Sequence, residues 1–168
     1  VALWRPQCRH AHIDLRWHPP PIDCRLMADP DQLGQVFLNV IGNAVEAVGA
    51  GGWVEVELRI ADCGLRIEPG ESAIRHPPSA IVTVVDSGPG PPPEVAGRLF
   101  EPFVSGKKDG VGLGLAVARQ VIEAHGGRID WRREADRTCF MIELPLEPRG
   151  EEELTNERNG SEPGFDRR

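Results

Sequence analysis

The chain has 168 residues, of which 40% are hydrophobic and 27% charged, and its formal net charge at pH 7 is −7. This length suits one domain with its own core, and the negative charge argues against broad binding to nucleic acid or to an anionic membrane. The four cysteines form no C-x-x-C pair, and no apolar run approaches the roughly 20 residues that span a bilayer. We therefore expect no zinc site, and we expect the domain to lie in the reducing cytoplasm. The first residue is not methionine, so we expect a piece of a longer protein. Whether that protein has a membrane anchor stays open.

The first predicted elements are a strand and a long helix. Apolar and polar residues alternate over 12–17, before a turn-forming HPPP sequence. A helix is predicted over 29–48 and is followed by a cluster of glycines that would end it. Asp29 is a good N-cap, Pro30 suits the first helical position, and Gln32 occupies the capping-box position.

The predicted helix has an apolar face and a narrow polar stripe. Its apolar residues are Leu33, Val36, Phe37, Val40, Ala44 and Val48, and its polar stripe is Gln32, Gln35, Asn39, Asn43 and Glu46. A solvent-facing surface would account for such a stripe. However, Asn39 and Asn43 are poor helix formers one turn apart, and their amide oxygens would project together as oxygen ligands for Mg²⁺. Both interpretations stay open from the helix alone.

Two further strands are predicted in the middle of the chain. Residues 53–60 alternate as a half-buried strand, and the β-branched run IVTVV at 81–85 predicts a central strand buried on both faces. The polar segment 61–79 between them is predicted to form a hairpin or a surface excursion. Residues 91–110 are rich in proline, glycine, lysine and serine, with one short helical piece at 95–99.

The last part of the chain predicts a helix and a hairpin. The helix begins at Leu113 and ends at a pair of glycines, and the hairpin strands cover 128–134 and 138–146. These elements predict an α/β fold, with helices packed on one face of a mixed sheet of about five strands. Residues 149–168 are charged and nearly free of aromatic residues, so we expect a disordered tail.

Two glycine-rich stretches indicate places where a ligand approaches the main chain. In DSGPG, Asp86 ends a predicted strand, and the two glycines after it leave the backbone open. GVGLGL opens a helix, so its amide groups and the helix dipole would face an anion. Neither stretch fits the P-loop or the dinucleotide-binding pattern. Tight turns would account for either stretch taken alone.

Four motifs in order, NVIGNAVEA, DSGPG, FEPF and GVGLGL, resemble the N box, first glycine box, F box and second glycine box of sensor histidine kinases. The neighbouring sequences are similar to the nitrogen- and oxygen-sensing branch. The resemblance covers about residues 10–146 and implies that residues 1–148 form the ATP-binding catalytic domain. It also implies a Bergerat-type two-layer sandwich that binds ATP with Mg²⁺.

The resemblance implies a role for individual residues. Asn43 would be the magnesium ligand, and Asn39 would lie near the phosphates on the same helix face, both of them catalytic. Asp86 would accept a hydrogen bond from the adenine amino group, while Gly88 and Gly90 let the ring and the sugar approach. The other expected ATP-binding residues are Lys107, Lys108, Gly110, Gly112, Leu113, Gly114, Leu115 and Thr138. The two lysines fit a solvated loop tip equally well.

Residues 91–110, here named the lid segment, resemble the ATP lid of that family, with Phe100 and Phe103 as apolar anchors. Glu46 stands where many members carry Lys or Arg, which removes one possible phosphate contact. His125 is expected to be a helix-end residue. Trp53 and Trp131 are expected to be packing aromatics.

The phosphoacceptor is expected outside this chain. None of the five histidines has the following acid and nearby proline that the acceptor has in this family. The resemblance therefore implies a separate dimerisation and phosphotransfer domain, a homodimeric full-length protein, and a response regulator receiver domain as the next partner. Asn39 stands where gyrase and chaperone ATPases carry a general-base glutamate, which predicts slow hydrolysis. A serine kinase of the anti-sigma-factor type and a degenerate nucleotide-sensing module remain alternatives.

Overall fold

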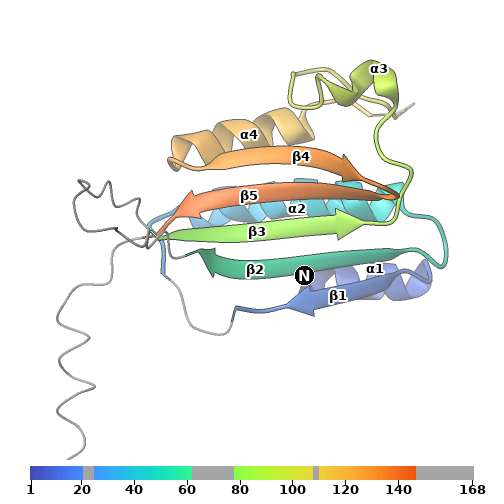
Figure 1. Cartoon of the computed structure of the whole chain (residues 1–168), viewed down its shortest axis with the longest axis horizontal. Helices are drawn as coiled ribbons and strands as arrows, with labels where there is room; N and C mark the ends of the chain where they lie inside the picture. Colours follow the sequence, from blue (N-terminus) through green and yellow to red (C-terminus); the bar gives the residue numbers. More distant parts are fainter. Residues whose placement is uncertain (21–24, 62–77, 108–109, 147–168) are drawn as a thin grey trace, which may run out of the picture.

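A computed structural model describes residues 1–20, 25–61, 78–107 and 110–146 of the chain (Figure 1). Most of the predicted excursion at 61–79, the whole tail at 149–168 and Lys108 lie outside the described residues. The elements in chain order are η1 (Ala2–Trp4), α1 (Arg5–His10), β1 (Asp14–His18), α2 (Pro30–Ala47), β2 (Trp53–Ala61), β3 (Ser79–Asp86), α3 (Pro93–Ala96), α4 (Gly114–Ala124), β4 (Arg128–Glu134) and β5 (Arg137–Pro145). Among these helices, none has the length and apolar character needed to cross a membrane.

The five strands form one mixed sheet in the order β1-β2-β3-β5-β4. β1 pairs with β2 in parallel, and the other neighbours are antiparallel. Figure 1 shows α2 and α4 behind this sheet, so the predicted α/β sandwich with helices on one face is confirmed. β3 is the central strand, as predicted.

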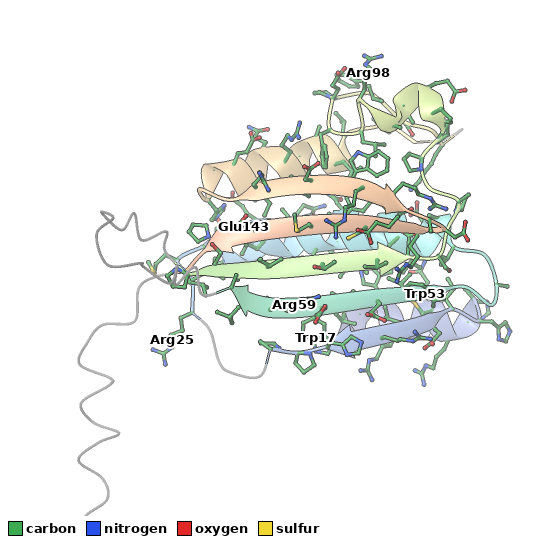
Figure 2. The ribbon with its side chains drawn as sticks, in the orientation of Figure 1. Trp17, Arg25, Trp53, Arg59, Arg98 and Glu143 are labelled. Carbon is green, nitrogen blue, oxygen red and sulfur yellow. The ribbon has the colours of Figure 1, made fainter. Side chains whose placement is uncertain are left out.

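The predicted burial of β3 on both faces is wrong. Alternate residues of β3 are buried, whereas Ile81, Thr83 and Val85 between them are only half-buried. The reason is that the helices cover one face only. Figure 2 shows the other face, on which the side chains of Arg59 and Glu143 stand.

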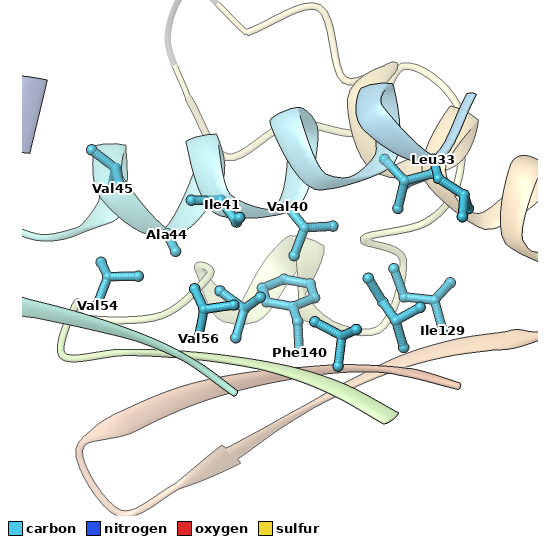
Figure 3. Packing of buried hydrophobic residues seen from close by; sticks show 14 of the residues in the cluster. Leu33, Val40, Ile41, Ala44, Val45, Val54, Val56, Ile129 and Phe140 are labelled. Carbon is cyan, nitrogen blue, oxygen red and sulfur yellow. The ribbon is translucent and has the colours of Figure 1, made fainter. Parts of the chain in front are cut away.

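The core lies between α2 and the covered face of the sheet. Leu33, Val36, Val40, Ala44 and Val48 are buried as predicted, whereas Phe37 is half-buried and packs against this cluster. Figure 3 shows α2 residues packed over Val54 and Val56 of β2, Phe140 of β5 and Ile129 of β4. Burial of each such side chain contributes about 1.5–3 kcal/mol. This packing fixes the rotation of α2 about its axis, and so the direction of its polar stripe.

The start of α2 is joined to the end of α4. Asp29 caps α2 as predicted, because its Oδ1 accepts from the N–H groups of Asp31 and Gln32 at 2.9 and 3.1 Å. The Gln32 side chain does not complete a capping box but donates to the Asp29 carboxylate at 2.8 Å. The N–H of Asp29 instead donates to Nε2 of His125, 3.1 Å away at the C-terminus of α4. The predicted helix-end position of His125 is confirmed, and it aligns two helices that border the same cavity.

The short N-terminal helices η1 and α1 were not predicted. Their one fully buried side chain is Cys8, and the ring of Trp4 packs against α2. A Cβ atom at Gly42 would lie 3.1 Å from the Trp4 ring, so the absence of a side chain there makes room for the indole.

Candidate functional site

A cavity of about 900 Å³ opens between α2, the end of β3, the lid segment and the start of α4. Ten of the predicted nucleotide-binding residues line it: Asn43, Asp86, Gly90, Lys107, Gly110, Gly112, Leu113, Gly114, Leu115 and Thr138. The fold therefore brings the N box, both glycine boxes and β5 to one cavity. Its volume is typical of a small-molecule site, for which about 300–1,000 Å³ is usual.

Asn39 and Gly88 lie beside the cavity and are not among its lining residues, and the structure does not describe Lys108. The cavity also has an apolar wall that was not predicted, which includes Val95, Leu99 and Phe140. Phe140 and Ile142 are two residues apart in a predicted strand and therefore point to the same, buried face. The inward direction of Phe140 could have been found from that periodicity.

Asp86 is a buried carboxylate in the lining of this cavity. It is the last residue of β3 and only 1% of its surface is exposed. Its Oδ1 accepts the N–H of Gly88 at 2.8 Å, which turns the chain sharply after the strand. A Cβ atom at Gly88 would lie 2.8 Å from the carbonyl oxygen of Ala47, so this turn requires glycine.

Burial raises the pKa of the Asp86 carboxyl above its ordinary value. The Gly88 N–H, the Arg133 charge and a hydrogen bond from Thr138 oppose that shift by favouring the ionised form. A buried carboxylate that faces a cavity costs stability, and such groups are common where a ligand is recognised.

Asn43 faces the cavity from α2, and Lys107 reaches it from the lid segment. The Lys107 ammonium donates to Oδ1 of Asn43 at 2.8 Å and also pairs with the carboxylate of Glu46. Glu46, which was expected to make no phosphate contact, thus forms an ion pair with Lys107, which is expected to make one. The Asn43 oxygen is directed toward a cation.

Asn39 joins α2 to the second glycine box. Its amide nitrogen donates to the carbonyl oxygen of Gly114 at 3.0 Å, and its oxygen accepts from Gln35 at 3.1 Å. These bonds hold the first residue of α4 against α2. A contact between Asn39 and phosphate stays a prediction.

The second glycine box places the start of α4 at the cavity. Gly112 has φ +73°, and a Cβ atom there would lie 2.6 Å from the carbonyl oxygen of Val104. In the part of the chain that the structure describes, no side chain caps α4. The amide groups of its first turn and its dipole are therefore suited to an anion in the cavity.

The lid segment has one aromatic anchor, not two. Phe100 packs edge-on against Phe140, with ring centroids 6.4 Å apart, and the Arg119 guanidinium lies 4.3 Å from the centre of its ring. Phe103 is 76% exposed, so its predicted role as an apolar anchor is wrong. Its backbone makes the connection instead, because its N–H donates to the Gly112 carbonyl oxygen at 2.9 Å.

The two tryptophans differ in their surroundings. Trp131 packs against the core and lies 6.4 Å from the Phe140 ring, which confirms its packing role. Trp53 is half-buried at the start of β2, and the Arg16 guanidinium lies 5.6 Å from the centre of its ring.

Comparisons with known proteins agree with this geometry. Residues 28–148 match the family described as histidine kinase-, DNA gyrase B-, and HSP90-like ATPase. The sensory histidine kinase/phosphatase NtrB of Rhodobacter capsulatus is 41% identical over 123 residues, which are 73% of this chain and 34% of that protein. The chain thus spans about a third of the length of this curated relative.

Solved structures of catalytic domains are similar over most of the chain. The nucleotide-free catalytic domain of histidine kinase ThkA has a TM-score of 0.68 and 29% identity, over 86% of each chain. ThkA in complex with response regulator protein TrrA has a TM-score of 0.64 and 27% identity, over 86% of this chain and 37% of that one.

Full-length ShkA in complex with AMPPNP has a TM-score of 0.65 and 31% identity, over 86% of this chain and 28% of that one. The chain therefore belongs to the histidine kinase-, DNA gyrase B- and HSP90-like ATPases, as a catalytic domain of the type found in two-component sensor histidine kinases.

Proposed function

We propose that residues 1–148 bind ATP with Mg²⁺ in the cavity between α2, α4 and the end of β3, and transfer the γ-phosphoryl group to a histidine on a separate dimerisation domain. One observation carries this proposal: Asp86, Asn43 and the glycines at the start of α4 line a single cavity, although they are far apart in the sequence. The complex of the relative ShkA with AMPPNP supports a nucleotide as the ligand.

Each side of the cavity suits one part of the nucleotide. Asp86 would accept from the adenine amino group, and the glycine turn after it would let the base approach the main chain. Leu99 and Phe140 offer apolar contact to the base from the wall. The amide groups at the start of α4 and the Lys107 ammonium would bind the phosphates.

Asn43 fits the expected magnesium ion. Its Oδ1 already accepts from an ammonium group at 2.8 Å, so a cation can reach this oxygen. Amide oxygens together with water and phosphate oxygens form a ligand set that Mg²⁺ prefers. The ion would neutralise charge on the phosphates.

The described residues favour transfer to an external acceptor over hydrolysis. Phosphoryl transfer depends mainly on positioning and charge neutralisation, so the site needs few reactive side chains. Asn39 cannot take a proton from water, and its amide is engaged with Gly114 and Gln35. The chain would therefore hold and orient the nucleotide while the acceptor imidazole arrives from the dimerisation domain.

The proposed surroundings of this domain are a cytoplasmic, homodimeric kinase and a response regulator with a receiver domain. The complex of the relative ThkA with the response regulator TrrA supports this choice of partner.

A trans-phosphorylation assay tests the proposed function. The chain is incubated with ATP labelled at the γ-phosphate and with the dimerisation domain of the full-length protein, produced separately. We expect a labelled acceptor whose phosphate is stable to alkali and labile to acid, as phosphohistidine is. Label that survives acid on a partner protein would favour the serine kinase, and nucleotide binding without any transfer would favour the sensing module.

Replacing Lys107 by alanine should weaken ADP binding about threefold to tenfold, because one charge-assisted contact with phosphate is lost. Adenosine, which lacks phosphates, should bind the variant and the wild-type chain equally. Calorimetric titration with both ligands measures the difference.

Arg98→Ala is the matched control, since Arg98, labelled in Figure 2, is another cation of the lid segment. It pairs with Glu101 at 2.8 Å. Equal losses for ADP and adenosine in Lys107→Ala would contradict a phosphate contact.

A further inference from the structure

Arg133 was not among the predicted site residues, yet it lies in register with two of them. Arg133 of β4 is paired with Thr138 of β5, and Thr138 is paired with Asp86 of β3. The three residues thus form one row across three neighbouring strands. The row ends at the adenine end of the proposed ATP site.

The Arg133 guanidinium connects the hairpin to the glycine turn. Its Nη1 donates to the carbonyl oxygen of Gly88 at 2.7 Å and to Oγ1 of Thr138 at 2.9 Å. Gly90 has φ +77°, and a Cβ atom there would lie 3.1 Å from the same nitrogen. Although the end of β4 is exposed, both acceptors are in buried residues.

These bonds determine the direction of the Thr138 hydroxyl. A guanidinium can only donate, so the Thr138 oxygen must act as an acceptor toward Arg133. The single hydroxyl proton is then available to the Asp86 carboxylate, because Asp86 is the register partner of Thr138 on the neighbouring strand. The chain of donors runs from Arg133 through Thr138 to Asp86, and each bond polarises the next.

We infer that Arg133 is a positioning residue for base recognition, which directs the Thr138 hydroxyl at Asp86 and so leaves only acceptors facing the 6-position of a bound purine. This inference rests on the proposed ATP site and goes beyond it by naming what sets the choice of base. An acceptor-only surface favours the 6-amino group of adenine and opposes the 6-carbonyl group of guanine or hypoxanthine. Without Arg133 the Thr138 hydroxyl can rotate and donate to such a carbonyl.

The test compares ADP with inosine diphosphate, which carries a carbonyl group where adenine has its amino group. Calorimetric titration of both nucleotides is done with the wild-type chain, Arg133→Met and Arg133→Lys. We expect Arg133→Met to lose about fivefold to tenfold in ADP affinity, the size of one charge-assisted contact that is partly open to solvent. The affinity for inosine diphosphate should stay constant or rise, so the ratio of ADP affinity to inosine diphosphate affinity falls.

Arg133→Lys keeps a charge and a donor, so it should restore part of that ratio. Arg132→Met is the matched control, because Arg132 pairs with Glu134 at 2.6 Å and is paired in register with Cys139 instead of Thr138. It should leave both affinities unchanged.

If the ratio of ADP affinity to inosine diphosphate affinity is unchanged in Arg133→Met, the inference is overturned, whether or not both affinities fall. A purely structural role would weaken the binding of both nucleotides equally. A wild-type chain that binds neither nucleotide would overturn the proposed function itself.

Discussion

Replacing Asp86 by asparagine should weaken ADP binding roughly 10- to 100-fold at neutral pH, because a hydrogen bond to a buried charged group is lost and a donor takes its place. The Gly88 N–H holds Oδ1 of residue 86 at 2.8 Å, so the amide oxygen of the variant stays at that position. Its NH₂ group then occupies the other position, where the adenine amino group needs an acceptor. Calorimetric titration with ADP measures the loss.

The same variant should be at least as stable as the wild-type chain without nucleotide. Burial raises the pKa of the Asp86 carboxyl in the folded state above its usual value. A carboxyl group whose folded pKa is raised favours folding below its unfolded pKa, and this contribution is lost as the pH rises through the folded pKa. Above the folded pKa the ionised group therefore lowers stability, and the neutral amide removes that cost.

Thermal unfolding of Asp86→Asn without ligand should give a melting temperature equal to or above that of the wild type. Asp130→Asn, an exposed carboxylate of β4, is the matched control and should change neither ADP affinity nor melting temperature. Unchanged ADP binding in Asp86→Asn would refute the adenine assignment. A large fall in its melting temperature would show a structural role instead.

Replacing Asn43 by alanine should abolish the gain in ADP affinity that Mg²⁺ provides, and should slow phosphotransfer on the order of 100-fold, because the developing charge is less well neutralised. The variant removes an oxygen that already lies 2.8 Å from a cationic group. Residue 43 lies in the interior of α2, and alanine is a strong helix former, so α2 should still form. Titrations of ADP with and without Mg²⁺, together with the transfer assay, measure both effects.

Asp31→Ala, in the exposed first turn of α2, is the control and should retain the full response to Mg²⁺. Adenosine binding distinguishes a loss of the metal site from a loss of base recognition, since adenosine affinity should be equal in Asn43→Ala and in the wild type. An Asn43→Ala chain that still gains affinity from Mg²⁺ would contradict the assignment of Asn43 as the magnesium ligand.

The sequence predicted the strands and long helices well because their signals are local. The 3.6-residue period placed Val36 and Val40 in the core, and the alternating run at 53–60 became β2. The helices within Ala2–His10 escaped because η1 and α1 are too short to show a period and contain one fully buried side chain, Cys8. Burial on both faces of β3 was a wrong prediction, since β-branched residues suit a half-buried face as well as a core.

Ten of the predicted site residues came together at one cavity, but their contacts could not be derived from the sequence. The contact of Lys107 with Asn43 and Glu46 joins residues more than 60 positions apart, and it depends on the path of the lid segment. Phe103 is an apolar residue of the F box, yet its side chain is exposed and its backbone N–H donates to the carbonyl oxygen of Gly112. Arg133 could have been placed on the inner face of β4 from its spacing with Ile129 and Trp131, but its hydrogen bonds require the register of the sheet.

One cavity, we propose, binds a magnesium nucleotide between the first glycine box and α2. A crystal structure of the chain with a non-hydrolysable ATP analogue and Mg²⁺ tests it most directly. We expect the adenine amino group within hydrogen-bond distance of Asp86, a magnesium ion on Oδ1 of Asn43, and Lys107 moved from Asn43 to phosphate. An analogue that lies elsewhere on the chain, or a cavity left unchanged at saturating concentrations of the analogue, would contradict the account.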